Sequence, residues 1–209
     1  MNLTRGVIFI KKALIVLTEA YADWEVSYVA AELAMSHGFE IDTVSLGEST
    51  VTSIGQLKTI VDYTIDDIKD PYDALIIIGG NNWSQIENEQ LAQLIKTSLD
   101  NNIVVGAICA AVDFFARNGL LTGYKHTGND LNQWTTEEHY KAYTNALDFM
   151  NEDSVVDKNL VTANGSSAVD FAFNIIRALG LLDYKEAEKQ KYFYKSGYVS
   201  YKMKYGEIG

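Results

Sequence analysis

Short apolar runs alternate along the chain with segments in which apolar residues recur at helical spacing. The apolar runs, whose length and composition predict buried strands, are residues 13–17, 40–46, 74–78 and 103–108. The segments with helical spacing are residues 24–37, 89–99, 110–119 and 166–179. This alternation predicts an α/β fold in which helices cover both faces of a mostly parallel central sheet.

The remaining segments have weaker patterns. Residues 47–60 are turn-rich and β-branched, which is consistent with a small hairpin, and residues 136–150 predict a polar helix. Residues 154–157 and 159–162 predict the two strands of a second hairpin. The tail from residue 185 is rich in tyrosine and lysine, and we interpret it as a surface helix with an irregular end. The alternative is a docking surface for a second subunit.

The length of 209 residues predicts one domain with one substantial core. Residues 1–10 are interpreted as a short leader before the first core strand, because Lys11 and Lys12 interrupt the apolar stretch and no cleavage site follows. No apolar run approaches the ~20 residues needed to span a bilayer, so we expect no membrane segment.

Charge and cysteine content exclude some classes of function. The formal charge is -11, and the sequence has no excess of basic residues that could neutralise a run of phosphates, so we expect no nucleic-acid partner. A single cysteine cannot form an internal disulfide, and no Cys/His group has the spacing of a zinc site. These features predict a cytoplasmic protein without a bound metal.

The one cysteine, Cys109, lies where a strand is expected to break sharply into a helix. Such a junction needs small residues two positions away on each side, and Ala107 and Ala111 occupy those positions. The pattern is a cysteine version of the nucleophile elbow, and the helix N-terminus after it favours a thiolate. The alternative is a buried structural cysteine that acts as a small hydrophobic residue.

Three acids follow the first strand, at the sheet edge where the cysteine elbow is also expected. A partly buried carboxyl beside a cysteine has a raised pKa, and when protonated it can donate a hydrogen bond to the thiolate. Glu19, Asp23 and Glu25 all compete for this role. Helix geometry alone does not choose among them.

Two further groups of residues are candidates for the same site. Gly79, Gly80 and Asn81 end the third strand, where backbone N–H groups can form an oxyanion hole together with the N–H of Ala110. His126 lies seventeen positions beyond the cysteine, in a segment that can return past the elbow and polarise the thiol.

Taken as an ordered set, five short motifs resemble the ThiJ/PfpI family, a cysteine branch of the class I glutamine amidotransferase-like superfamily. They are Ala-Asp-Trp-Glu at 22–25, Ile-Ile-Ile-Gly-Gly at 76–80, Ala-Ile-Cys-Ala-Ala at 107–111, Gly-Leu-Leu-Thr-Gly at 119–123 and His-Thr-Gly-Asn at 126–129. Residues 159–165 and 169–172 resemble the last hairpin and helix of the family.

The resemblance implies a three-layer flavodoxin-like sandwich, homodimeric and free of cofactors. Its domain covers residues 11–182, and residues 183–209 are an extension of the same domain. The reactive cysteine corresponds to Cys109, and the protonated acid beside it corresponds to Glu25. By resemblance, not by geometry, this selects one of the three acids.

The chain also departs from the family in ways that bear on the reaction. Members proposed to be peptidases carry a histidine directly after the cysteine, whereas this chain has Ala110. Glutamine amidotransferases supply a late His-x-Glu, and no such triplet follows Cys109. We therefore expect an enzyme with hydrolase, lyase or deglycase chemistry on a small carbonyl or acyl substrate. The alternatives are a redox-sensing or stress-response protein that works through oxidation of Cys109, and an inactive interaction module.

Overall fold

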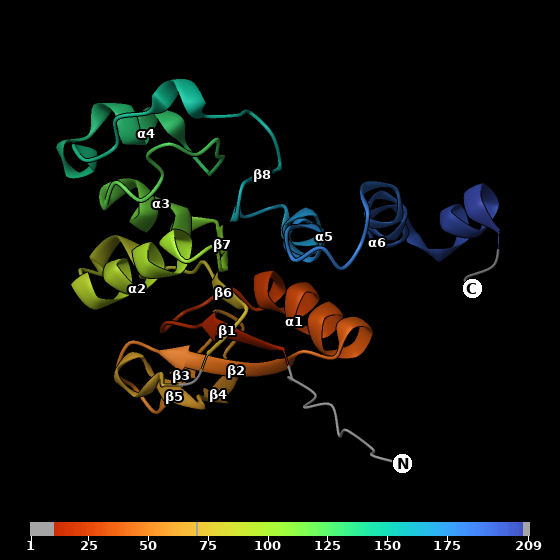
Figure 1. Cartoon of the computed structure of the whole chain (residues 1–209), viewed down its shortest axis with the longest axis horizontal. Helices are drawn as coiled ribbons and strands as arrows, with labels where there is room; N and C mark the ends of the chain where they lie inside the picture. Colours follow the sequence, from red (N-terminus) through yellow and green to blue (C-terminus); the bar gives the residue numbers. More distant parts are fainter. Residues whose placement is uncertain (1–10, 70, 207–209) are drawn as a thin grey trace, which may run out of the picture.

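A seven-stranded sheet lies at the centre of the computed structural model, which describes residues 11–69 and 71–206 (Figure 1). Its strands, in spatial order, are β5 (Tyr63–Thr64), β2 (Glu40–Ser45), β1 (Lys12–Val16), β6 (Ala74–Ile77), β7 (Val104–Ile108), β9 (Leu160–Ala163) and β8 (Ser154–Asp157). All neighbouring strands run parallel except β8 and β9, which form an antiparallel pair. The predicted mostly parallel sheet is confirmed.

Helices cover both faces of this sheet. One face carries α1 (Asp23–His37) and α5 (Ala168–Ala178), and the other carries α2 (Glu89–Asp100) and α3 (Ala110–Arg117). The short helix α4 (Leu131–Thr136) lies beyond α3, and α6 (Tyr184–Tyr205) packs on the outer side of α5 (Figure 1). The arrangement is the expected three-layer α/β sandwich.

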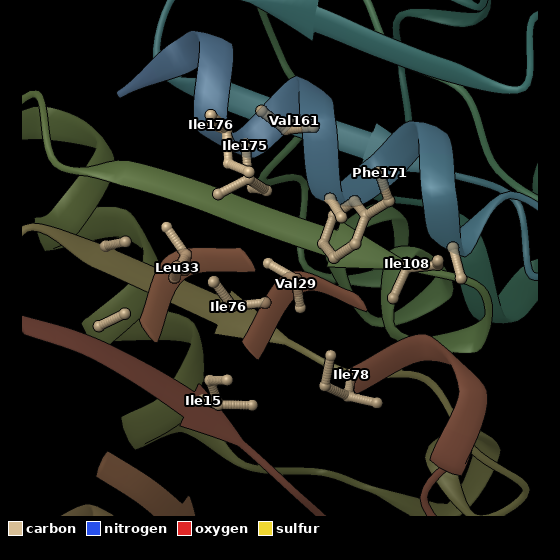
Figure 2. Packing of buried hydrophobic residues seen from close by; sticks show 14 of the residues in the cluster. Ile15, Val29, Leu33, Ile76, Ile78, Ile108, Val161, Phe171, Ile175 and Ile176 are labelled. Atoms are coloured by element: carbon tan, nitrogen blue, oxygen red, sulfur yellow. The ribbon is translucent and has the colours of Figure 1, made fainter. Parts of the chain in front are cut away.

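Alternation along the buried strands divides the core into two clusters. Ile15 and Ile76 point to the α1 and α5 face, in the same cluster as Val29 and Phe171, and Figure 2 shows Ile76 beside Val29. Leu75, which directly precedes Ile76, points to the other face, among the apolar side chains of α2 and α3. Apolar residues at every position of a strand therefore reflect burial on both faces.

The smaller elements include one correction to the sequence analysis. The hairpin of β3 (Thr50–Thr52) and β4 (Lys58–Ile60) and the hairpin of β8 and β9 are present as expected. The predicted helix over residues 136–150 is wrong, because its only regular elements are the end of α4 and two 3-10 turns, η3 (Glu138–Tyr140) and η4 (Ala146–Asp148). Asn145 contributes to this difference, because its side-chain amide donates to the carbonyl of Leu121 at 2.8 Å and holds the chain in a loop.

Two further 3-10 turns, η1 (Ile65–Asp67) and η2 (Trp83–Gln85), follow β5 and β6. The tail differs from its expected irregular end, because α6 continues to Tyr205 with a kink at Gly197, where φ is 82°. The expected leader over residues 1–10 lies outside the described residues. Within the part of the chain that is described, no helix combines the length and the apolar character needed to cross a membrane.

Candidate active site

Cys109 occupies the single residue between the end of β7 and the start of α3. Its φ is 59° and its ψ is -134°, a conformation that residues other than glycine rarely adopt. The backbone is held on both sides: the N–H of Cys109 donates to the carbonyl of Ala163 at 2.9 Å, and its own carbonyl accepts from the N–H of Val112 at 3.0 Å. The small neighbours Ala107 and Ala111 are fully buried against the turn. The strand–cysteine–helix junction expected from the sequence is therefore present.

Glu25 lies in the first turn of α1 and is fully buried. Its Oε2 atom accepts a hydrogen bond from the N–H of Gly79 at 2.8 Å. Its Oε1 atom is also buried but has no hydrogen-bond partner of good geometry. The carboxyl interacts directly with the Cys109 thiol. Both Oε1 and the sulfur face Gly165, where an added Cβ would be 2.6 Å from Sγ and 3.5 Å from Oε1.

The other two acids that follow the first strand serve loop structure. The carboxylate of Glu19 accepts from the N–H of Thr52, and that of Asp23 accepts from the N–H of Gly55, each at 2.8 Å. Both partners lie in the segment that forms the β3–β4 hairpin. Of the three candidate acids, Glu25 is the one in direct interaction with Cys109.

Burial opposes ionisation of both members of this pair. It raises the pKa of Glu25 from 4.5 to about 7. Burial, followed by the negative charge of Glu25, raises the pKa of the Cys109 thiol to about 11. The helix N-terminus favours the anion through the N–H of Ala110, but burial and the charge of Glu25 outweigh this effect on the pKa of the thiol. Because the two groups interact strongly, the first proton leaves the pair as a whole near pH 7.

Two hydrogen-bond donors reach the sulfur and favour its anion. The side-chain amide of Asn129 donates to Sγ at 3.4 Å, and the N–H of Ala110 also lowers the pKa of the thiol. The side-chain oxygen Oδ1 of Asn129 accepts from the N–H of Gly165 at 2.9 Å. The indole of Trp24 donates to the carbonyl of Gly165 at 3.3 Å, so this glycine is held from both sides over the sulfur.

Asn129 and Gly165 were not identified as site residues in the sequence analysis. Both belong to motifs that carried the family resemblance, the His-Thr-Gly-Asn segment and the Asn-Gly step after the last strand. They meet only in the folded chain, 36 positions apart.

The expected oxyanion donors differ in what they contact. The N–H of Gly79 is occupied by Glu25, so this residue holds the carboxyl in place. The N–H of Asn81 donates to the carbonyl of Ala20 at 3.0 Å and is occupied as well. Gly80 packs so closely on the loop before α1 that a Cβ on it would be 2.4 Å from the oxygen of Ala20. Of the four expected donors, Ala110 is the one whose N–H lowers the pKa of the Cys109 thiol.

His126 lies outside this group of residues, contrary to expectation. It is fully buried, and aromatic side chains of Trp134, Tyr143 and Phe149 surround it. Its Nδ1 is 2.8 Å from the carbonyl of Tyr124, and its Nε2 is 2.8 Å from the hydroxyl of Tyr143. A carbonyl only accepts, so Nδ1 carries the proton and Nε2 accepts from the hydroxyl. Burial lowers the pKa of His126, which keeps the ring neutral.

The sulfur faces a cavity of about 540 Å³. The residues that line it are Cys109, Thr127, Gly128, Asn129, Asn151, Glu152, Asp153, Asn164, Gly165 and Ser166. A volume of this size is typical of a site for a small molecule. Within residues 11–69 and 71–206, no three His, Cys, Asp or Glu side chains are grouped so that they can bind a metal ion.

Comparison with known families and proteins gives matches along most of the chain. The model of the DJ-1/PfpI family matches residues 11–178. A Bacillus subtilis protein named uncharacterized protease YdeA is 40% identical over 196 residues, which cover 94% of this chain and 97% of that protein. The glutathione-independent glyoxalase DJR-1.2 of Caenorhabditis elegans is 23% identical over 172 residues, which cover 81% of this chain and 89% of that protein.

Solved structures show the same architecture. The DJ-1 superfamily protein Atu0886 from Agrobacterium tumefaciens matches with a TM-score of 0.80 and 33% identity, over 90% of this chain and 100% of that chain. A thiJ/pfpI family protein from Bacillus anthracis matches with a TM-score of 0.84 and 26% identity, over 95% and 96% of the two chains. The region that matches the family model runs from β1 to the end of α5, and it contains both Cys109 and Glu25.

Proposed function

Because this chain belongs to the DJ-1/PfpI family, we propose that Cys109 is a nucleophile toward small carbonyl or acyl compounds and that Glu25 is its proton partner. One observation carries this proposal: the buried Oε1 atom of Glu25, which lacks a hydrogen-bond partner, lies beside the sulfur. The cavity in front of the sulfur has room for a small substrate.

The unpaired oxygen supports a particular protonation state. An ionised carboxylate with a buried oxygen that accepts no hydrogen bond is costly, because water no longer solvates the charge. A protonated carboxyl removes this cost, since its O–H donates to the neighbouring sulfur while Oε2 still accepts from Gly79. The negative charge then lies on Cys109, where the N–H groups of Asn129 and Ala110 stabilise it. In the proposed resting state, Glu25 is neutral and Cys109 is a thiolate.

In the proposed reaction, the thiolate of Cys109 forms a C–S bond with the carbonyl carbon, and the π electron pair of the C=O bond moves onto oxygen. With an aldehyde, the proton of Glu25 moves to that oxygen, which yields a neutral thiohemiacetal and a carboxylate. With an acyl compound, the same proton goes to the departing group as its bond to carbon breaks. Water then attacks the thioester, Glu25 takes a proton from that water, and the thiolate leaves.

Among the relatives described above, one is named a protease and another a glyoxalase. Features of this chain favour chemistry on small molecules over hydrolysis of proteins. Residue 110 is an alanine, and the buried His126 uses both ring nitrogens in other contacts. The nucleophile therefore has Glu25 rather than a histidine as its proton partner. We expect no release of peptides from unfolded casein.

The test measures how many equivalents of a substrate the full chain consumes. Glyoxal and p-nitrophenyl acetate serve as the aldehyde and acyl probes. We expect each mole of protein to consume many moles of at least one probe, an activity that Cys109→Ala abolishes and His126→Gln retains. Consumption of a single equivalent would contradict catalysis, and activity that persists in Cys109→Ala would contradict the role of this residue.

A second candidate function is redox sensing through oxidation of the same sulfur. The observation that favours it is that the sulfur borders an open cavity and has a carboxyl beside it that can donate to a sulfinate oxygen. Mild peroxide is then expected to add two oxygens at Cys109, which mass spectrometry detects. If this adduct forms readily and no probe is turned over, the sensing function is favoured over the enzyme.

A further inference from the structure

The rim of the cavity in front of Cys109, formed by Glu152 and Asp153, is negatively charged. Its ionisable side chains other than the cysteine are Glu152 and Asp153, and both are exposed. The other polar side chains that line it are the amides of Asn129, Asn151 and Asn164 and the hydroxyls of Thr127 and Ser166. Among the ten residues that line this cavity there is no lysine, arginine or histidine. A substrate that approaches the sulfur therefore meets carboxylates and neutral dipoles.

The cation that pairs with this rim is already shared between two acids. Lys195, from α6, is 2.7 Å from Oδ2 of Asp170 and 3.7 Å from Oδ2 of Asp153. Asp170 is largely buried and also lies 3.8 Å from Lys191. The ammonium of Lys195 thus compensates Asp153 only in part. Glu152 forms no ion pair with any residue that the structure describes, and the cations Lys125 and Arg177, which line a neighbouring cavity with it, compensate its charge only at longer range.

A second cavity of about 380 Å³ adjoins the first one. The two share Asp153 and Ser166 in their linings, and the second one adds Trp24, Tyr28, Asp170 and Lys195. Trp24 is 49% exposed, and the faces of its indole and of a tyrosine ring attract cations. A substituent that extends from the reacting carbonyl toward this second cavity therefore meets aromatic rings and two carboxylates, Asp153 and Asp170, which share the ammonium of Lys195.

We propose that the Cys109 site selects polar substrates with a positive charge next to the reacting carbonyl, such as amino aldehydes or aminoacyl groups, and disfavours anionic oxo acids. This inference rests on the proposed nucleophilic role of Cys109. The formal charge of -11 on the whole chain acts in the same direction, because an acidic surface with an acidic cleft concentrates cations at its entrance. The selection acts on binding and approach, and it needs no group that the chain does not contain.

The test compares the rates at which three thiol reagents of different charge modify Cys109 in the full chain. They are a methanethiosulfonate with a trimethylammonium group, one with a sulfonate group, and neutral methyl methanethiosulfonate. Each rate is divided by the rate of the same reagent with 2-mercaptoethanol, which removes the intrinsic reactivity of the reagent. We expect the normalised cation-to-anion ratio to be about tenfold at low salt and to fall in 0.5 M NaCl, because salt screens exposed charges.

Variants locate the origin of this ratio. Glu152→Gln and Asp153→Asn are each expected to lower it, and Lys195→Met is expected to raise it because Asp153 loses its cation and Asp170 keeps only Lys191. Glu40→Gln is the matched control, since it removes one exposed carboxylate at the start of β2, on the sheet edge opposite Cys109. If Cys109 shows the same cation-to-anion preference as 2-mercaptoethanol, the inference is overturned. It is also overturned if Glu152→Gln and Asp153→Asn leave the normalised ratio unchanged.

The neutral reagent separates the inference from the proposed function. Fast reaction with methyl methanethiosulfonate at neutral pH supports the nucleophilic cysteine whatever the ratio is. If that reaction is fast and the ratio shows no preference, the charge selection fails and the nucleophile stands. If none of the three reagents modifies Cys109, both proposals fail.

Discussion

Glu25 and His126 are both titratable side chains with no exposed surface, yet their surroundings differ in one respect. The carboxyl of Glu25 has one oxygen held by Gly79 and one oxygen without a partner beside Cys109. The imidazole of His126 has both nitrogens engaged, one with the carbonyl of Tyr124 and one with the hydroxyl of Tyr143. One group therefore retains a free hydrogen-bonding position, and the other has none.

This difference shows which buried polar groups can take part in proton transfer. Histidine is the residue expected to accompany a reactive cysteine, but here its hydrogen bonds are used to order an aromatic cluster with Trp134 and Phe149. A carboxyl with one free oxygen can hold or release a proton without breaking other contacts. The availability of a group follows from the hydrogen bonds it leaves open, not from its residue type.

The largest effect that we expect from this comparison is on stability, at His126. His126→Ala removes a buried ring and leaves the Tyr143 hydroxyl without its acceptor, so the free energy of unfolding falls by about 3 kcal/mol. Urea unfolding measures this loss. The pH midpoint of Cys109 alkylation stays where it is in the wild type. A shifted midpoint would show that His126 acts on the cysteine, which would contradict the contrast drawn between Glu25 and His126.

The two groups also change the pH dependence of stability with opposite signs. The folded chain raises the pKa of Glu25 from 4.5 to about 7, so this carboxyl contributes full stability below pH 4.5 and loses it as pH rises toward 7. The folded chain lowers the pKa of His126, so the stability from its neutral ring is present above pH 6.5 and is lost as pH falls.

Substitutions by glutamine isolate these two slopes. Relative to the wild type, Glu25→Gln is expected to remove a decline of about 1 kcal/mol per pH unit between pH 4.5 and 7. His126→Gln is expected to remove a decline in the other direction, on acidification below pH 6.5. Unfolding free energies measured across this range give both differences. For each variant, the difference in unfolding free energy from the wild type is plotted against pH. If the two differences change with pH in the same direction, the assignment of a protonated Glu25 and a neutral His126 is refuted.

A smaller effect, confined to reactivity, is expected at Gly165. A methyl group at this position would lie 2.6 Å from the sulfur, so Gly165→Ala is expected to slow alkylation of Cys109 roughly 10-fold to 100-fold. Ser166→Ala, the neighbouring substitution in the same cavity, adds no volume and serves as the control. The rate of iodoacetamide labelling measures both. An unchanged rate in Gly165→Ala would show that the reagent reaches the sulfur from a side away from Gly165.

Much of the fold follows from local sequence pattern, because a strand buried on both faces is apolar at every position. The expected strands at 13–17, 74–78 and 103–108 agree with β1, β6 and β7 to within one residue at each end. The elbow was also predictable, since small residues on both sides of Cys109 reflect a local steric requirement. The segment 136–150 was mispredicted because side-chain hydrogen bonds to other loops, such as that of Asn145, replace a regular helix.

The site was less predictable because its contacts join distant parts of the chain. Glu25 is selected over Glu19 and Asp23 by a hydrogen bond to Gly79, 54 positions away. The same bond occupies the N–H of Gly79, which local pattern alone assigned to an oxyanion hole. Asn129 and Gly165 meet across 36 positions. Residue types indicate which groups can react, but tertiary contacts decide which hydrogen bonds remain free.

The central claim is that the shared proton lies on Glu25 and the charge on Cys109. The most direct test is the pH dependence of iodoacetamide alkylation of Cys109 in the wild type and in Glu25→Gln. The account predicts a wild-type midpoint near pH 7, where the pair loses its first proton, and a midpoint above about 8.5 in the variant, where a buried thiol ionises without the donor. If Glu25 instead carries the charge, the wild-type midpoint lies near 11, and the substitution lowers it by removing the repulsion. A midpoint that falls in Glu25→Gln would contradict the account.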